Sequence, residues 1–268
     1  GERIHTLASV RSVGRDPAGD WAVAGVQRSS AFVVGSRMVV LCTNRRLGLP
    51  RHMQLRGEVE FGGAVRRGLR GDVDSLRCAA EEVAVLGMGA FAIENMRTSL
   101  ERGAAHVRFL CRRRGTVCPQ LVDWINFVRP FDADLKHDAA GDAVVLSHWH
   151  RAYDLSAAVR PECWAAGLLK PDGHTVSVSD MFFIAHHVQK ASTQLGEASC
   201  LAAGGVVSRS GELLRAGVVI MCVGFELNEG NERLLGRSRM HPTGLAAAGL
   251  WLQMEPHLDS SAFSSPFG

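Results

Sequence analysis

An apolar run that two glycines interrupt constrains the fold of this chain most: residues 83–98 read VAVLGMGAFAIENMRT. Residues 83–86 are all apolar, which is typical of a strand buried on both faces of a parallel sheet. Gly87 permits a tight turn, and Gly89 has no side chain where a phosphate would approach the backbone. Ala92 is the third small residue, where a helix packs closely on the strand. The spacing therefore predicts a strand, a phosphate-binding turn and a helix N-terminus, whose amides and dipole attract anions.

The residues after this stretch decide the interpretation, because the same glycine spacing also arises by chance in chains rich in alanine and glycine. In residues 90–106 apolar side chains recur at helical spacing, and Gly103 is a plausible end of that helix. Residues 106–115, HVRFLCRRRG, predict a second strand that ends in three arginines. Strand, helix and strand in this order are the beginning of a nucleotide-binding unit.

The three arginines indicate which nucleotide such a unit would bind. Units that bind NAD carry Asp or Glu roughly 20 residues after the glycines, against the ribose hydroxyls. Here Arg112 lies 25 positions after Gly87 (112 − 87), and no acid stands at the strand tip. Guanidinium groups pair with a 2′-phosphate, whereas a carboxylate repels it. We therefore expect Arg112 and Arg113 to bind the 2′-phosphate of NADP; the alternative is a solvated charged loop.

Composition bounds the class of protein. The chain has 268 residues, 46% of them hydrophobic and 21% charged, which is typical of a globular protein with one large domain or two modest ones. A formal net charge of +3 gives no electrostatic footprint for nucleic acid. The seven cysteines form no CxxC pair, which argues against a redox dithiol or zinc knuckle and favours a reducing, cytoplasmic compartment. We expect no secretory signal, and the apolar run 216–225 is too short to span a bilayer.

The N-terminal part of the chain shows strand-like alternation rather than helical spacing. Three segments alternate in this way: 3–13, 20–27 and 29–43. A turn signal, RDPAGD at 15–20, separates the first two. These patterns predict a β-meander that continues into an apolar strand, Met38–Leu41, which ends at Cys42.

A similar pattern returns near the other end of the chain. Residues 196–228 contain short strands, a Ser-Gly turn and an apolar strand that ends at Cys222. Two matching segments on either side of a nucleotide-binding unit suggest one domain that another interrupts. We therefore expect a first domain in two parts and an inserted nucleotide-binding domain, with the ranges 1–50, 200–268 and 51–199.

Three stretches resemble the flavin-containing monooxygenases and related class B flavoprotein monooxygenases: VVLCTNRRLGLP (39–50), VLGMGAFAIE (85–94) and VVIMCVGFELN (218–228). In that family an NADP domain splits an FAD domain, and strand-tip motifs mark the two crossings. The resemblance covers nearly the whole chain, which corresponds to the C-terminal portion of these monooxygenases. It implies an α/β fold in which a Rossmann-like NADP-binding domain is inserted between parts of an FAD-type domain with β-meander segments.

The sequence also departs from the family pattern. The first crossing has Asn44 after Thr43 where glycine is usual, and the second has Val223 before Gly224 where threonine is usual. The family signature that precedes the glycine turn keeps its glycine at Gly57 but not its flanking residues. Together with the lack of a separate glycine turn for FAD, these changes count against catalytic competence.

The resemblance implies NADP and FAD as cofactors, and it assigns no catalytic residue here. The expected cofactor contacts lie in the glycine turn, the first helical turn, the arginines and the two strand tips: Gly87, Met88, Gly89, Ala90, Phe91, Ala92, Arg112, Arg113, Thr43 and Gly224. Tight FAD binding needs a glycine-rich turn of its own, and the one present is assigned to NADP. We therefore expect this chain not to hold FAD tightly.

The implied activity is that of an oxidoreductase, a flavoprotein monooxygenase that uses NADPH and FAD to oxygenate a small nitrogen or sulfur nucleophile or a ketone. The alternative is a non-catalytic NADP-binding remnant or truncated paralogue that lacks FAD. Without a complete FAD unit the meander strands would expose apolar faces, so we expect a second copy or a partner to cover them. The expected ligands are small molecules, with no nucleic acid and no membrane span.

Other chemistries have weaker signals. Histidines occur at 148, 150, 186 and 187, but adjacent His186 and His187 cannot point the same way, and no Cys, Asp or Glu set accompanies them. We therefore expect no metal site. Residues 179–190 predict an amphipathic helix with Ser179 as its N-cap. No G-x-S-x-G motif is present, which argues against a hydrolase of that kind.

Overall fold

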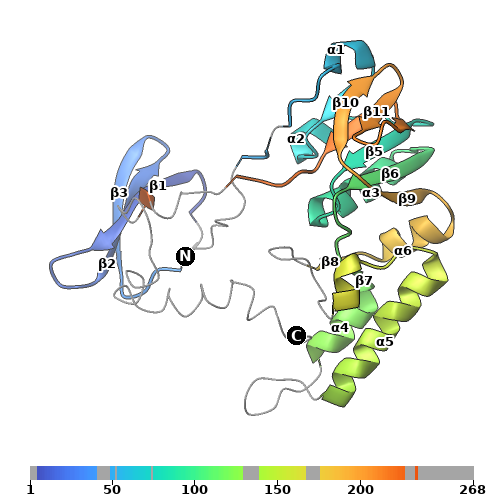
Figure 1. Ribbon diagram of the computed structural model, residues 1–268. Coiled ribbons are helices and arrows are strands. Elements are labelled where there is room, and N and C mark those ends of the chain that lie inside the picture. Colours follow the sequence, from blue (N-terminus) through green and yellow to red (C-terminus); the bar gives the residue numbers. More distant parts are fainter. Residues whose placement is uncertain are drawn as a thin grey trace. The chain divides into compact units, whose positions relative to one another are not determined.

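The computed structural model describes residues 5–40, 49–51, 53–73, 75–128, 139–166, 176–226 and 233–234. The chain divides into two compact units, which are described separately below (Figure 1). The larger unit holds residues 53–224, and residues 5–51 and 225–226 belong to the smaller one. None of the helices in the described ranges combines the length and the apolar character needed to cross a membrane.

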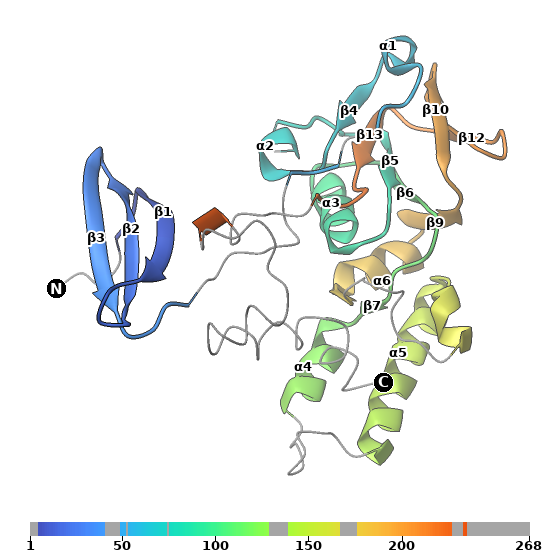
Figure 2. The same ribbon diagram turned by 60° about the vertical axis from the view of Figure 1, so that its left-hand side comes forward.

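The larger unit contains a five-stranded sheet in which every pair of neighbours is parallel. Its strands, in spatial order, are β4 (Ala64–Arg66), β13 (Val218–Met221), β5 (Glu82–Leu86), β6 (His106–Cys111) and β9 (Ala191–Leu195) (Figure 2). From β5 the chain proceeds to β6 and β9 on one side, whereas β13 and β4 lie on the other. The strand order therefore reverses between β5 and β13, and ligands of such sheets bind at that switch point, outside the carboxyl ends of the strands.

One face of this sheet is covered by α3 (Ala90–Glu101) and α6 (Asp180–His187). Alternate residues of β5 point to the two faces, so that Val83 and Val85 join Ile93 and Phe182 in the core on the helical side. The expected buried strand at 83–86 and the helix after it are confirmed. The helix ends as predicted: the Gly103 amide donates to the Leu100 carbonyl at 2.9 Å and the Ala104 amide to Ser99 at 3.0 Å, as in a Schellman motif.

The opposite face is covered by a small antiparallel sheet and a short helix. These elements are β10 (Ala198–Ala202), β11 (Gly205–Ser208), β12 (Leu213–Arg215) and α1 (Glu58–Phe61). Leu201 and Leu214 pack with Leu86, Val219 and Phe61 in this second core. The sheet is thus buried on both sides, which explains why residues 83–86 of β5 and all of β13 are apolar.

The expected boundary between residues 199 and 200 falls inside this unit. β13, expected to return to the FAD-type domain, is instead a central strand that pairs with both β4 and β5. Its four residues are all buried. Pairing with a strand on each side therefore provides partners for the backbone hydrogen bonds of β13 and keeps its apolar side chains away from water. The boundary is therefore displaced to residues 224–225.

A helical part of the larger unit lies between β7 (Val117–Cys118) and β8 (Ser177–Val178), which pair in parallel. Its elements are α4 (Gln120–Val128), α5 (Ala139–Ser156) and the 3₁₀ helix Glu162–Ala166 (Figure 1). Tyr153 of α5 is fully buried, and its hydroxyl accepts a hydrogen bond from the Val117 amide at 2.9 Å. The remaining helix, α2 (Arg70–Val73), follows β4. Residues 129–138, which follow α4, lie outside the described ranges.

The smaller unit contains the expected meander. β1 (Ala8–Arg15), β2 (Trp21–Gln27) and β3 (Ser30–Ser36) pair antiparallel in this order. The apolar strand predicted from Met38 is not formed by residues 38–40: β3 ends at Ser36, whose hydroxyl donates to the Met38 carbonyl at 2.6 Å, and Met38 is exposed. Cys42 and Thr43 lie outside the described residues.

Two short segments of the smaller unit flank the larger unit in sequence and pair with each other. Pro50 and Phe225 form an antiparallel bridge, and the Glu226 amide donates to the Leu49 carbonyl at 2.8 Å. The segment that leads into the larger unit and the segment that leads out of it are therefore hydrogen-bonded neighbours.

His186, which the sequence places on an amphipathic helix, is buried in the core of the larger unit. Ser179 caps α6 as predicted and accepts from the Phe182 amide. The His186 ring stacks on Phe109, with Nδ1 2.8 Å from the Phe182 carbonyl and Nε2 3.2 Å from Thr193 Oγ1. Burial lowers the pKa of His186 below its usual value of 6.5, and it also lowers that of His106.

We expect the free energy of unfolding to fall as the pH drops below about 6.5. Below this pH, His186 is protonated in the unfolded chain but stays neutral in the folded protein. The part of the free energy of unfolding that depends on neutral His186 is therefore lost on acidification. Replacing His186 by Gln should flatten this dependence and leave the part due to His106, and H106Q should leave the part due to His186. Urea unfolding between pH 5 and pH 8 measures the slopes; an H186Q slope equal to wild type would contradict the assignment.

Candidate functional site

The glycine turn follows β5 at the switch point of the sheet. Gly87 has φ 109°, a left-handed conformation that favours glycine, and its amide donates to the Leu110 carbonyl of β6 at 2.9 Å. A Cβ at this position would overlap the carbonyl oxygen of Cys222, just beyond β13. The turn is therefore pressed between the ends of β6 and β13, and only glycine fits.

Gly89 has a different role from Gly87. It is the N-cap residue of α3, with extended backbone and no side-chain cap on the helix. A Cβ at Gly89 would meet no atom within 4 Å, so the space in front of the helix N-terminus is open. The amides of a first helical turn lack intrahelical acceptors and carry the positive end of the helix dipole. An anionic group can therefore approach the backbone here.

The other residues predicted around the turn divide by exposure. Met88 and Ala92 are buried, and Ala92 lies at the helix–sheet contact expected of the third small position. Ala90 and Phe91, in the first turn of α3, are exposed. Gly224 has φ 96° and open space around its Cβ position, in the segment that follows β13.

The loop of arginines after β6 lies against the glycine turn. A Cβ at Gly115 would overlap the carbonyl oxygen of Met88, and the Cys111 sulfur lies 3.9 Å from the Met88 sulfur. Burial raises the pKa of the Cys111 thiol to about 12, so this sulfur packs as an uncharged group at neutral pH. The structure thus brings together two segments that the sequence predicted as partners.

The three arginines of this loop have different surroundings. The Arg112 side chain is 75% exposed, and its Nε lies 3.7 Å from Glu197. Arg113 is also exposed. Arg114 is 14% exposed and forms an ion pair with Glu162, which also accepts from the Arg114 amide at 3.0 Å. Arg112 and Arg113 are therefore accessible to a ligand, whereas Arg114 holds the loop to the 3₁₀ helix.

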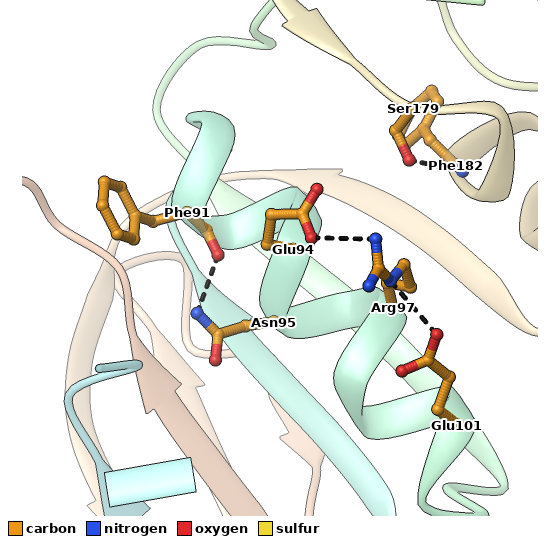
Figure 3. A network of polar contacts seen from close by, with 7 residues as sticks. All are labelled: Phe91, Glu94, Asn95, Arg97, Glu101, Ser179 and Phe182. Atoms are coloured by element: carbon orange, nitrogen blue, oxygen red, sulfur yellow. Dashed lines mark hydrogen bonds and ion pairs between the residues drawn. The ribbon is translucent and has the colours of Figure 1, made fainter. Parts of the chain in front are cut away.

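Asn95 is a buried polar residue at this site that the sequence analysis missed (Figure 3). Its amide nitrogen donates to the Gly68 carbonyl at 2.9 Å and to the Phe91 carbonyl at 2.7 Å, and it lies 3.5 Å from the Cys222 sulfur. Burial raises the pKa of the Cys222 thiol to about 12, against the effect of the bond from Asn95. Asn95 thus ties α3 to the loop after β4 and to the end of β13, the segments that frame the turn.

The exposed side of α3 carries ordinary surface ion pairs (Figure 3). Arg97 lies 3.3 Å from Glu94 and 3.1 Å from Glu101, and all three side chains are about half exposed. Exposed pairs of this kind contribute little to stability. Glu94 is therefore part of the solvent face of the helix.

A cavity of about 460 Å³ lies on the other side of the switch point, at the carboxyl ends of β4 and β13. Its lining comes from α1, both strand ends and the segment around α2: Glu58, Val65, Arg66, Arg67, Asp72, Ser75 and Met221. The sequence analysis did not predict it, because these residues carry no local motif. Two arginines, Arg66 and Arg67, are among the residues that line it.

A search against protein-family models and a search of curated protein sequences found no match. Solved structures do match, and they define the class of fold: a mixed α/β fold of the kind found in flavoprotein monooxygenases. At sequence identities this low, the likeness concerns the fold.

The similar structures include a steroid monooxygenase and two structures of cyclohexanone monooxygenase. Oxidized steroid monooxygenase bound to NADP is 16% identical, with 90% of this chain and 57% of that chain covered and a TM-score of 0.54. ε-Caprolactone-bound cyclohexanone monooxygenase is 15% identical, with coverages of 90% and 58% and a TM-score of 0.51. The open form of cyclohexanone monooxygenase is 14% identical, with coverages of 89% and 58% and a TM-score of 0.52. The chain thus spans less than two thirds of the length of these proteins.

Proposed function

We propose that residues 53–224 bind NADP(H) and that the chain is part of a flavin-dependent monooxygenase. The proposed reaction is the NADPH- and FAD-dependent oxygenation of a small nitrogen or sulfur nucleophile or of a ketone. One observation carries the proposal: an open glycine turn lies at the switch point of a parallel sheet, with two exposed arginines in the adjoining loop. The likeness of the fold to steroid monooxygenase bound to NADP supports it.

The residues present fit a dinucleotide phosphate. The open space at Gly89 and the N-terminus of the 12-residue helix α3 would receive the pyrophosphate. Arg112 and Arg113 would bind the 2′-phosphate, because guanidinium groups match phosphate geometry. Met88 and Ala92 would keep the turn packed on the sheet, while Ala90 and Phe91 would border the ligand.

NADPH, when bound, supplies a hydride to the flavin. The smaller unit would then be the FAD-type part of the protein, with Thr43 and Gly224 near the two crossings. What the described residues contribute is binding and orientation: the turn holds the phosphates, and the exposed arginines select the nucleotide. The cavity beyond β13 offers space on the side of the switch point away from these arginines.

A second function, a non-catalytic NADP-binding protein without flavin, is favoured by a specific observation. Among the described residues, Gly87–Gly89 is the one glycine turn that leads into the N-terminus of a helix of eight or more residues. An absorbance spectrum of the purified chain separates the two functions. A chain that binds added FAD, turning yellow, and whose flavin is then bleached by NADPH supports the monooxygenase, and a chain that binds NADP but no added FAD supports the alternative.

The Gly89→Ala variant tests the phosphate site itself. A methyl group there meets no protein atom, so we expect stability to change by about 1 kcal/mol at most, as for other N-cap changes. It would occupy the space in which the pyrophosphate approaches, and NADP⁺ affinity should fall at least about tenfold, or 1.4 kcal/mol. Isothermal titration calorimetry measures this loss.

Gly35→Ala is the matched control for this experiment. Gly35 lies in β3 of the smaller unit, and a Cβ there also meets no atom within 4 Å. We expect this variant to bind NADP⁺ as the wild type does. Wild-type affinity in G89A would place the pyrophosphate elsewhere and would overturn the proposed site.

A further inference from the structure

An acid beside the arginine loop comes from a different strand. Glu197 follows β9, and its carboxylate bridges two arginines: Oε2 lies 2.6 Å from Arg209 Nη1, and Oε1 lies 3.7 Å from Arg112 Nε. Arg209 belongs to the turn between β11 and β12. The Glu197 side chain is 31% exposed, and both arginines are 75% exposed.

The backbone around Glu197 is fixed to the end of β6. The Gly196 amide donates to the Cys111 carbonyl at 2.8 Å, directly before the arginine loop begins. The Arg209 amide donates to the Glu197 carbonyl, also at 2.8 Å. Glu197 is therefore held beside Arg112 by main-chain bonds on both sides, and its position does not depend on the ion pairs alone.

This arrangement changes the electrostatics of the nucleotide site. No acidic residue directly follows β6 in the sequence. Glu197, which follows the parallel neighbouring strand β9, lies at the same edge of the sheet. A carboxylate there competes with a 2′-phosphate for Arg112 and repels its negative charge. Arg209 opposes this effect, because it neutralises the carboxylate at close range.

We propose that Glu197, with Arg209 as its counter-ion, sets how strongly this site prefers NADP(H) over NAD(H). The inference rests on the proposed function, since it concerns the same nucleotide site. Glu197 lowers the preference by holding Arg112, and Arg209 restores part of it. A nucleotide without the 2′-phosphate does not compete with Glu197, so its affinity is insensitive to both residues.

The test compares NADP⁺ and NAD⁺ dissociation constants for the full chain and four variants at low ionic strength. E197Q should raise NADP⁺ affinity about three- to tenfold, and R209Q should lower it by a similar factor. Because Arg209 acts through Glu197, the E197Q/R209Q double variant should behave like E197Q alone, and NAD⁺ affinity should stay within about twofold throughout. Raising the salt concentration should shrink the differences, because exposed charges are screened.

Glu212→Gln is the matched control, because Glu212 lies on the same turn as Arg209 and its carboxylate accepts from Gln194 of β9 at 2.5 Å. This variant should leave the ratio of affinities unchanged. If E197Q weakens both nucleotides equally, or leaves NADP⁺ affinity unchanged, Glu197 has only a structural role and the inference is overturned. If wild-type protein binds neither nucleotide, the proposed function fails, and the inference fails with it.

Discussion

Replacing Gly87 with alanine is expected to lower the free energy of unfolding by about 2–5 kcal/mol and to abolish NADP⁺ binding. Two costs add at this position. An L-residue is strained at φ 109°, and its Cβ would overlap the carbonyl oxygen of Cys222. Because the obstacle is main chain at the end of a central strand, no side chain can move aside to relieve it. Urea denaturation followed by tryptophan fluorescence measures the loss.

Gly204→Ala separates the two costs. Gly204 lies between β10 and β11 with φ 85°, and a Cβ there meets no atom within 4 Å. This control carries the backbone strain without the overlap, so we expect a loss of about 1 kcal/mol. Equal losses in the two variants would show that the turn does not press against the end of β13.

The second large effect concerns the arginine loop. Removing both guanidinium groups in R112A/R113A should weaken NADP⁺ binding by about 1.5–3 kcal/mol for each charge-assisted hydrogen bond lost. NAD⁺ affinity should barely change, because NAD⁺ has no 2′-phosphate for these side chains to bind. Calorimetric titration of both nucleotides into the same preparation measures the difference.

Two other arginines provide controls for this variant. Arg160 forms an exposed ion pair with Asp154, and R160A should leave both affinities unchanged. Arg114 holds the loop to Glu162, so R114A should weaken both nucleotides together. If R112A/R113A behaves like R114A, the two exposed arginines support the loop and do not read the phosphate.

Local signals in the sequence were sufficient for residues 83–115. The structure contains the predicted elements in the predicted order: the buried strand β5, the glycine turn, the helix α3 with its end at Gly103, and the strand β6 before the arginines. Each of these features depends on residues within one turn or strand. That is why the turn, and the loop beside it, could be found without knowledge of the rest of the fold.

Features that depend on distant residues could not be found in this way. The expected 199/200 boundary differs from the end of the larger compact unit at Gly224, because nothing local to β13 shows that it pairs between β4 and β5. Asn95 could have been noticed as a polar residue on the buried side of α3, but not its bonds to Gly68 and Cys222. Glu197 could not be found from the sequence, because the acid of an NAD-binding unit is expected after β6, whereas Glu197 follows the neighbouring strand β9.

The main property that we propose for this chain is NADP(H) binding at the Gly87–Gly89 turn, with recognition of the 2′-phosphate. Its most direct test is a titration of the purified chain with NADPH and with NADH, followed by the change in nicotinamide fluorescence. We predict saturation at one NADPH per chain and an NADPH affinity at least about tenfold higher than that for NADH. Equal affinities for the two nucleotides, or no saturable binding of NADPH, would contradict the claim.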